Sequence, residues 1–381
     1  MLKKFNFNYY LFNPFRIMER FIFLSVAITL FYTNIMAMPQ DSIKKPFSLG
    51  GKLHYGVILP HSELIRTLAF NNPFGIELNT NWLNYSQKAV SQLNCYSYTG
   101  LAINYIDFGH PKIGSSVNTW FYFEPMFRYQ HKLGFGLRSG IGISYLSTVY
   151  DEVSNPENKF FASHIAFMLV LDLKIKYKIS RKTELNASIC YNHISNGGFK
   201  QPNYGMNFPT LTLGVRYHFR PVDLQPIVKE KLNPAKKVWK LKAELLTSIK
   251  VQNKTDIYDE KACFAYGIAA FANKRLSKFS ALNFGCEFIA DGYIKEKIAR
   301  AGLDSDYKRA AGFIGHDLIF GKVNFTINLG IYFYSPFKAK DPFYEKYNLQ
   351  YTINKHLYTG VYMLAHGDAA EIMGLNVGFT L

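Results

Sequence analysis

The sequence predicts an all-β fold, a transmembrane antiparallel up-and-down β-barrel of about 14–16 strands in total. Three observations predict this class. The chain begins with an export signal, apolar and polar residues alternate along many segments, and aromatic residues are abundant, with 33 Phe and 27 Tyr among 381 residues. Alternating strands with aromatic girdles are typical of barrels in the bacterial outer membrane, so we expect that location.

Residues 1–37 have the layout of a secretory signal peptide. Lys3 and Arg16 precede a nearly continuous apolar run over 21–37, which ends in small residues near Ala37. Basic, apolar and small-residue regions in this order are typical of a cleaved signal. An uncleaved anchor is the alternative, although the apolar run is near the lower length limit for a membrane span.

The segments after residue 46 alternate between apolar and polar side chains, most clearly over 171–179, 239–251 and 323–333. Because successive side chains of a strand point to opposite faces, the apolar set would face lipid and the charged set the barrel interior. A soluble sandwich rarely repeats charged residues on one face over such long strands. The expected strands, in order, are 50–60, 73–82, 96–107, 118–130, 134–149, 162–179, 183–195, 208–219, 238–252, 261–275, 278–292, 308–319, 322–335, 347–355, 357–365 and 371–381.

The connections between these strands alternate in length. Short turns such as 180–183 alternate with longer polar loops such as 196–207. Outer-membrane barrels have short periplasmic turns and longer extracellular loops, so the first strand is expected to run outward. Two connections depart from the alternation, because 83–95 is long and 366–370 is short.

The chain divides into two β halves, 46–220 and 238–381, joined by a Pro-containing connection over 221–237. This connection is either a linker between an eight-stranded barrel and a second barrel-like half, or a long periplasmic turn inside one large barrel. Barrels of both sizes exist. One closed sheet per chain is the commoner solution, and a single large barrel is therefore favoured.

A His and a Ser lie two residues apart near the outer end of the strand 183–195. The period of two places His193 and Ser195 on its apolar face, and Asn207 has the same parity on the next strand. All three would face lipid near the outer leaflet. A polar cluster at such a position is costly unless it serves a function at the interface.

The residues of this cluster are those that acyl transfer requires. His193 could take the hydroxyl proton as Ser195 attacks an ester carbonyl, and nearby N–H groups would stabilise the oxyanion. Asn203 and the backbone around Gly197 and Gly198 are candidate donors. In most proteins such a pair is a structural His beside a surface Ser. The position of His193 and Ser195 at the lipid interface favours a catalytic role instead.

The motif resembles that of the PagL-type lipid A 3-O-deacylases, eight-stranded outer-membrane barrels that remove an ester-linked acyl chain from lipid A. The family pattern is His-x-Ser-Asn, then Asn-Pro-Gly, then Glu. The matching residues here are His193, Ser195, Asn196, Asn203 and Gly205. The resemblance covers 46–220, while 238–381 is similar to the C-terminal region of longer Bacteroidetes-type relatives described as acyloxyacyl hydrolases.

The resemblance implies a carboxylic ester hydrolase acting on lipid A. His193 would be the general base, Ser195 the nucleophile and Asn203 an oxyanion donor, with Asn196 and Gly205 as further candidate donors.

Two positions depart from the family pattern. Tyr204 replaces the Pro, and Asn207 stands where the family has its acid. An Asn can orient the His ring but cannot stabilise the imidazolium by charge, and the change from acid to Asn lowered turnover by about 10⁴ in a Ser-His-Asp triad. Glu371, near the outer end of the last strand, is a candidate substitute acid.

The expected partners are lipid A, or the whole lipopolysaccharide, in the outer leaflet and the surrounding membrane lipids. No metal, cofactor or nucleic acid is expected, since the cysteines lack metal-ligand spacing and anionic lipid headgroups explain the formal charge of +17. The oligomeric state is not indicated. The cysteines are Cys95, Cys190, Cys263 and Cys286.

Two alternatives to the esterase stay open: a non-catalytic structural or lipid-binding barrel, favoured by Asn207, and a diffusion pore if the barrel is a single large one.

Overall fold

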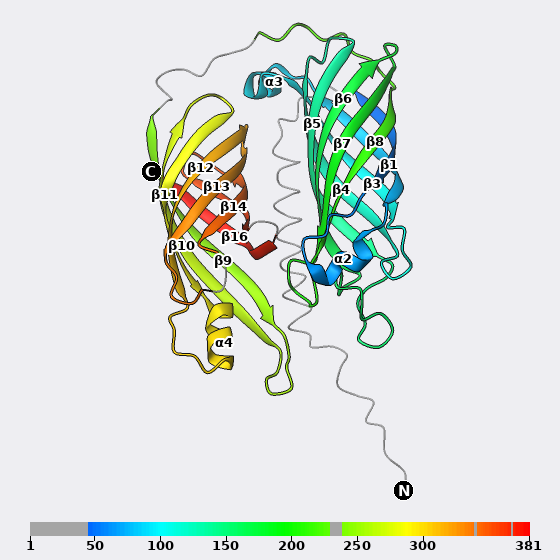
Figure 1. Ribbon diagram of the computed structural model, residues 1–381. Helices are drawn as coiled ribbons and strands as arrows, with labels where there is room; N and C mark the ends of the chain where they lie inside the picture. Colours follow the sequence, from blue (N-terminus) through cyan, green and yellow to red (C-terminus); the bar gives the residue numbers. More distant parts are fainter. Residues whose placement is uncertain (1–44, 229–237, 339–340, 367–368) are drawn as a thin grey trace. The chain divides into compact units, whose positions relative to one another are not determined.

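The computed structural model describes residues 45–228, 238–338, 341–366 and 369–381 (Figure 1). The expected signal peptide lies outside these residues, as does the part of the 221–237 connection after residue 228. Among the described residues, no helix is long and apolar enough to span a lipid bilayer.

Strands β1 to β8 close into one barrel, here called the first barrel (Figure 1). Each strand pairs antiparallel with the next, and β8 returns to pair with β1, with Leu53 opposite Leu213. The closure leaves neither strand with an unpaired edge. A sheet that spans a bilayer must be closed in this way, because lipid cannot satisfy free backbone N–H and C=O groups. The strands are β1 (Phe47–Gly56), β2 (Phe74–Asn84), β3 (Tyr96–Asp107), β4 (Ser115–Phe127), β5 (Leu133–Leu146), β6 (Ile165–Lys178), β7 (Thr183–Ser195) and β8 (Met206–His218).

Strands β9 to β16 close into the second barrel in the same way, with β16 paired to β9. The described residues thus contain sixteen strands, which confirms the predicted class and strand total. The favoured single large barrel is wrong, because β1 and β8 satisfy each other's hydrogen bonds. The strands are β9 (Trp239–Gln252), β10 (Lys261–Arg275), β11 (Ser280–Asp291), β12 (Lys308–Phe320), β13 (Val323–Tyr334), β14 (Phe343–Thr352), β15 (Leu357–His366) and β16 (Ala369–Thr380).

In the part of the chain that the structure describes, three short helices lie in the connections between strands. Helix α3 (Gln87–Leu93) begins at Ser86, whose hydroxyl accepts the Ala89 N–H, and it accounts for the long connection expected to be a short turn. Helices α2 (Glu63–Ala69) and α4 (Gly292–Arg300) lie in connections predicted to be long.

The alternation of side chains is as predicted. On β7, Leu185, Ile189 and Tyr191 are exposed on the outer face, while Glu184 and Asn192 are buried inside. The exposed apolar set is the face that a barrel presents to lipid.

Ion pairs occupy part of the interior of the first barrel. Arg138 donates to Glu77 over 2.9 Å, and Lys174 Nζ lies 2.7 Å from a carboxylate oxygen of Glu124. The side chains of these four residues are at most 1% exposed. Paired charges of this kind suit a water-free interior. The pore alternative required one large barrel, and the closed topology removes that premise.

Residues 221–228, which follow β8, form a strap across the end of the first barrel that carries the shorter turns. Leu224 and Ile227 pack against a cluster that includes Tyr96 and Tyr98. The Tyr96 hydroxyl donates to the Gln225 carbonyl over 2.7 Å, and the Gln130 side chain donates to the Leu224 carbonyl over the same distance. Loop lengths assign this end to the periplasm, so the strap covers the periplasmic mouth.

Candidate functional site

His193 and Asn207 are paired across the two strands that border the predicted site. They occupy opposite positions in the antiparallel register of β7 and β8. His193 Nδ1 lies 2.6 Å from Asn207 Oδ1, so the protonated Nδ1 donates to the amide oxygen. Both residues are half-buried on the outer face. This contact leaves Nε2, which carries the free lone pair, as the basic atom of the ring.

Ser195, the last residue of β7, receives two hydrogen bonds. The Asn203 side-chain amide donates to Ser195 Oγ over 2.9 Å, and the Gly197 backbone N–H donates to the same oxygen over 3.2 Å. Among the described contacts, no hydrogen bond joins Ser195 to the His193 ring. The serine oxygen is therefore held by the group types that bind an oxyanion, one side-chain amide and one backbone N–H.

Gly205 closes the loop over the His–Ser pair. Its φ is +68°, and a Cβ there would lie 3.2 Å from Ser195 Cβ and 3.4 Å from His193 Cε1. A glycine is thus required both by backbone conformation and by the close approach. The Gly205 N–H donates to the Phe160 carbonyl over 3.1 Å, so it anchors the loop and is not directed at Ser195.

Asn196 organises the loop from inside. Its side-chain amide donates to the Lys200 carbonyl over 2.8 Å, and its Oδ1 accepts the Gly198 N–H over 2.8 Å. Its backbone N–H donates to Asn203 Oδ1 over 3.2 Å. These bonds occupy the donors of Asn196 and aim the amide nitrogen of Asn203 at the serine.

The segment after β1 contributes residues that sequence reasoning missed. The Leu59 N–H donates to the Asn207 carbonyl over 2.8 Å, and His61 Nε2 lies 2.9 Å from the Tyr204 carbonyl. His61 Nδ1 is buried and has no hydrogen-bond partner. These residues reach the site because β1 pairs with β8, and only a prediction of eight-stranded closure would have found them.

An apolar cluster inside the first barrel packs behind the site, on the inner faces of β7 and β8. Ile194, Met206 and Phe208 alternate with the site residues along β7 and β8 and are fully buried. Phe208 packs edge-on against Phe108, with ring centroids 5.6 Å apart. Rigid strands over a packed core hold side chains more accurately than a free loop does.

Glu371, the candidate substitute acid, is engaged elsewhere. Arg309 donates to its carboxylate over 3.0 Å, and His366 Nε2 lies 2.9 Å from it, all within the second barrel. The described residues contain no group of three or more His, Cys, Asp or Glu side chains that could hold a metal ion.

The fold defines an integral β-barrel protein, and the site adds a Ser, a His and two Asn side chains gathered on its outer face. Comparison with protein families is more specific. Residues 71–216 match the lipid A 3-O-deacylase (PagL) family, and residues 241–381 match the C-terminal domain of acyloxyacyl hydrolases. The family resemblance predicted for each half is therefore confirmed, and with it the location in the bacterial outer membrane.

Solved structures show weaker likenesses. The crystal structure of the outer membrane enzyme PagL is 16% identical to this chain, with 43% of this chain and 97% of that chain covered at a TM-score of 0.34. A variant of the Rh. blastica porin is 10% identical, with 88% and 100% covered at a TM-score of 0.20. No curated protein matches the chain.

Proposed function

We propose that this protein is an outer-membrane serine esterase that hydrolyses an ester-linked acyl chain of lipid A. Ser195 is the nucleophile and His193 the general base. The observation that carries the proposal is the pair of N–H donors on Ser195 Oγ, from Asn203 and Gly197, beside an oriented His on the lipid-exposed face.

The first half of the reaction acylates the serine. His193 Nε2 takes the hydroxyl proton as Ser195 Oγ bonds to the ester carbonyl carbon, and the carbonyl oxygen becomes an oxyanion. The N–H groups of Asn203 and Gly197 stabilise that oxyanion. As the ester C–O bond breaks, the sugar hydroxyl leaves with the proton held by His193. Water then attacks the acyl-serine in the same way and releases the fatty acid.

Contact between the base and the nucleophile requires a side-chain rearrangement, because Ser195 Oγ is bonded to Asn203 and Gly197. Residues two apart on one strand face are neighbours, and Gly205 approaches both side chains. Catalytic hydrogen bonds often tighten only when substrate is bound. A substrate carbonyl that takes over the Asn203 and Gly197 donors would free Ser195 Oγ to turn toward His193.

The position of the site fits an ester in the outer leaflet. The cluster lies at the ends of β7 and β8 that carry the longer loops, which is the extracellular end. Exposed apolar residues such as Ile189 and Leu211 continue along the same faces toward the membrane centre. Acyl chains would lie along this surface while their ester groups reach the polar cluster.

The test is the acylation pattern of lipid A from cells that produce wild type or Ser195→Ala, read by mass spectrometry. We expect wild type to remove one ester-linked chain and the variant to remove none. Ser139→Ala is the matched control, because Ser139 is exposed on the outer face of β5 and belongs to no part of the site. Identical patterns from wild type and Ser195→Ala would instead support the non-catalytic barrel.

A further inference from the structure

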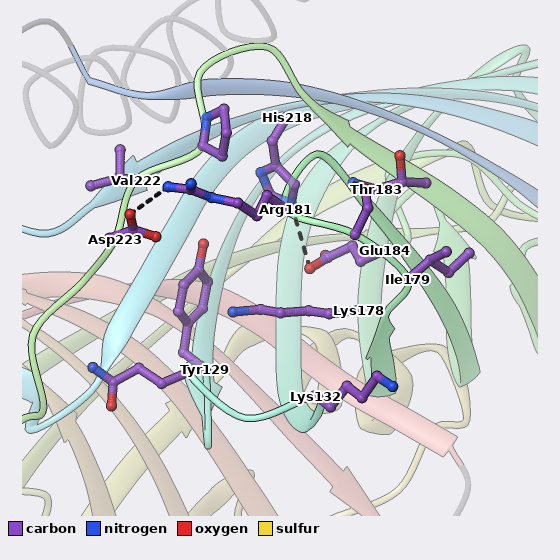
Figure 2. Close-up of a pocket in the computed structure, with 13 residues that line it drawn as sticks. Tyr129, Lys132, Lys178, Ile179, Arg181, Thr183, Glu184, His218, Val222 and Asp223 are labelled. Atoms are coloured by element: carbon purple, nitrogen blue, oxygen red, sulfur yellow. Dashed lines mark hydrogen bonds and ion pairs between the residues drawn. The ribbon is translucent and has the colours of Figure 1, made fainter.

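A pocket of about 290 Å³ opens at the periplasmic mouth of the first barrel, at the opposite end from the proposed esterase site. It lies between the β4–β5 turn, the β6–β7 turn and the strap, and Figure 2 shows Lys178 extended across it toward Tyr129. Nothing in the proposed function uses it. Its ionisable residues are Tyr129, Lys132, Lys178, Arg181, Glu184, His218 and Asp223.

The two carboxylates of the pocket are already paired. Glu184 lies 3.1 Å from Arg216 inside the lumen, while Asp223 pairs with Arg181 at the surface (Figure 2). The side chains of Arg181 and Asp223 are 72% and 82% exposed, and such surface pairs contribute little. Arg181 can therefore turn to a stronger anionic partner. Among the described residues, neither Lys132 nor Lys178 has a carboxylate oxygen within 4.0 Å.

Positive charge is concentrated around Tyr129. The ammonium groups of Lys176 and Lys178 lie 4.5 and 4.6 Å from the centre of its ring. The ammonium group of Lys132 lies 5.5 Å from the ring of Tyr177, which is exposed on the outer face of β6. Like charges so close together repel, and the repulsion is stronger where water is partly excluded. Lys176 has a carboxylate oxygen of Glu184 at 4.0 Å, so an anion in the pocket would relieve chiefly the charge of Lys178 and Lys132, which line it.

We propose that this pocket binds a phosphate-bearing anion at the periplasmic boundary of the membrane. Two ammonium groups and a guanidinium that can change partner are the donors that phosphate oxygens prefer. The exposed apolar side chains of Tyr177, Ile179 and Phe219 border the pocket, so a phospholipid headgroup could enter it while its chains stay on the barrel wall. Free phosphate shares the same chemistry.

The test measures binding to the full-length protein in a neutral detergent by titration calorimetry at fixed salt. The probes are inorganic phosphate and short-chain dihexanoyl phosphatidylglycerol. We expect saturable binding of at least one probe, weakened about tenfold in the double variant Lys132→Gln/Lys178→Gln. The matched control is Lys182→Gln, which removes the same charge from the β6–β7 turn without touching the pocket, and it should change affinity less than about twofold.

The two probes separate the sources of the phosphate. Lysine-dependent binding of phosphate itself identifies a simple anion site, and binding of the lipid alone identifies a headgroup site that needs the chains. Equal weakening by Lys182→Gln, or no saturable binding of either probe, overturns the proposal. Heat-dependent gel mobility checks that each variant is folded, and Lys132→Gln alone replaces the double variant if that one is not. Since no esterase residue is altered, the outcome is independent of the proposed activity.

Discussion

Asn207 is the residue on which the catalytic rate of the proposed site depends most. It holds the His193 ring by one hydrogen bond of 2.6 Å but carries no charge. A carboxylate at this position would also stabilise the imidazolium that forms as the serine is deprotonated. The proposed base is therefore oriented by a partner that stabilises its charge less than a carboxylate would.

The substitution Asn207→Glu tests this interpretation. We expect the deacylation rate on purified lipopolysaccharide to rise by at least about tenfold, because the carboxylate would support the charged ring. Asn207→Ala should lower the rate, since the ring loses its orientation. The measurement is the initial rate of fatty-acid release by mass spectrometry. An unchanged rate in Asn207→Glu would show that the missing acid does not limit catalysis.

The β7–β8 loop brings the site together at the scale of a structural element. Asn196 fixes Asn203, and Gly205 lets the returning chain pass close to both His193 and Ser195. The loop is anchored to the neighbouring β5–β6 loop through the Phe160 carbonyl. Its conformation, rather than strand parity alone, places the N–H donors on the serine.

Two glycines of this loop provide a matched comparison. Both Gly198 and Gly205 have positive φ, but a Cβ at Gly198 would meet only the end of the Gln201 side chain at 3.9 Å. We expect Gly205→Ala to abolish deacylation, because its Cβ would push apart Ser195 and the ring of His193. Gly198→Ala, with a similar backbone cost but no clash, should keep most of the activity. Equal losses in lipid A mass spectra would mean that backbone strain, not the close approach, is responsible.

Buried charge holds the first barrel together at the scale of the whole molecule. Glu77 bonds to Arg138 and His54 in the lumen, and its side chain is fully buried. Removing one partner of a buried pair leaves the other charge without compensation, which costs about 3–5 kcal/mol. The interior therefore contains a network of buried ion pairs next to its apolar cluster.

We expect Glu77→Gln to lower the free energy of unfolding by an amount of that order, because Asp172, at 3.4 Å, would be the one carboxylate still paired with Arg138 among the described residues. The control is Glu63→Gln in α2, whose pair with Arg66 is exposed and should change stability by less than about 1 kcal/mol. Urea unfolding in detergent, followed by gel mobility, measures both. Similar midpoints for the two variants would contradict a structural role for the lumen network.

Much of this architecture could be predicted, because a strand has a strict period of two. Once Leu185 and Ile189 are assigned to lipid, Glu184 must face the lumen and His193 and Ser195 must face outward. The alternation of short and long connections was read from the sequence. It fails at 83–95, where α3 lengthens a periplasmic turn, and between β15 and β16, where the connection is short. The same parity placed His193 and Asn207 on one face, while the register of β7 and β8 makes them opposite neighbours.

Closure could not be predicted in this way, because hydrogen bonds between β1 and β8 join residues about 160 positions apart without a sequence signature of their own. The decision between one large barrel and two small ones depended on that pairing. The approach of Leu59 and His61 to the site depended on it too. The engagement of Glu371 by Arg309 in the second barrel and the packing of the strap over the periplasmic mouth are further long-range contacts that the sequence pattern did not indicate. The sequence by itself determined which side chains face lipid, because that choice is local and periodic. Only the tertiary structure decided which strands meet, because sheet edges are joined by backbone groups that every residue shares.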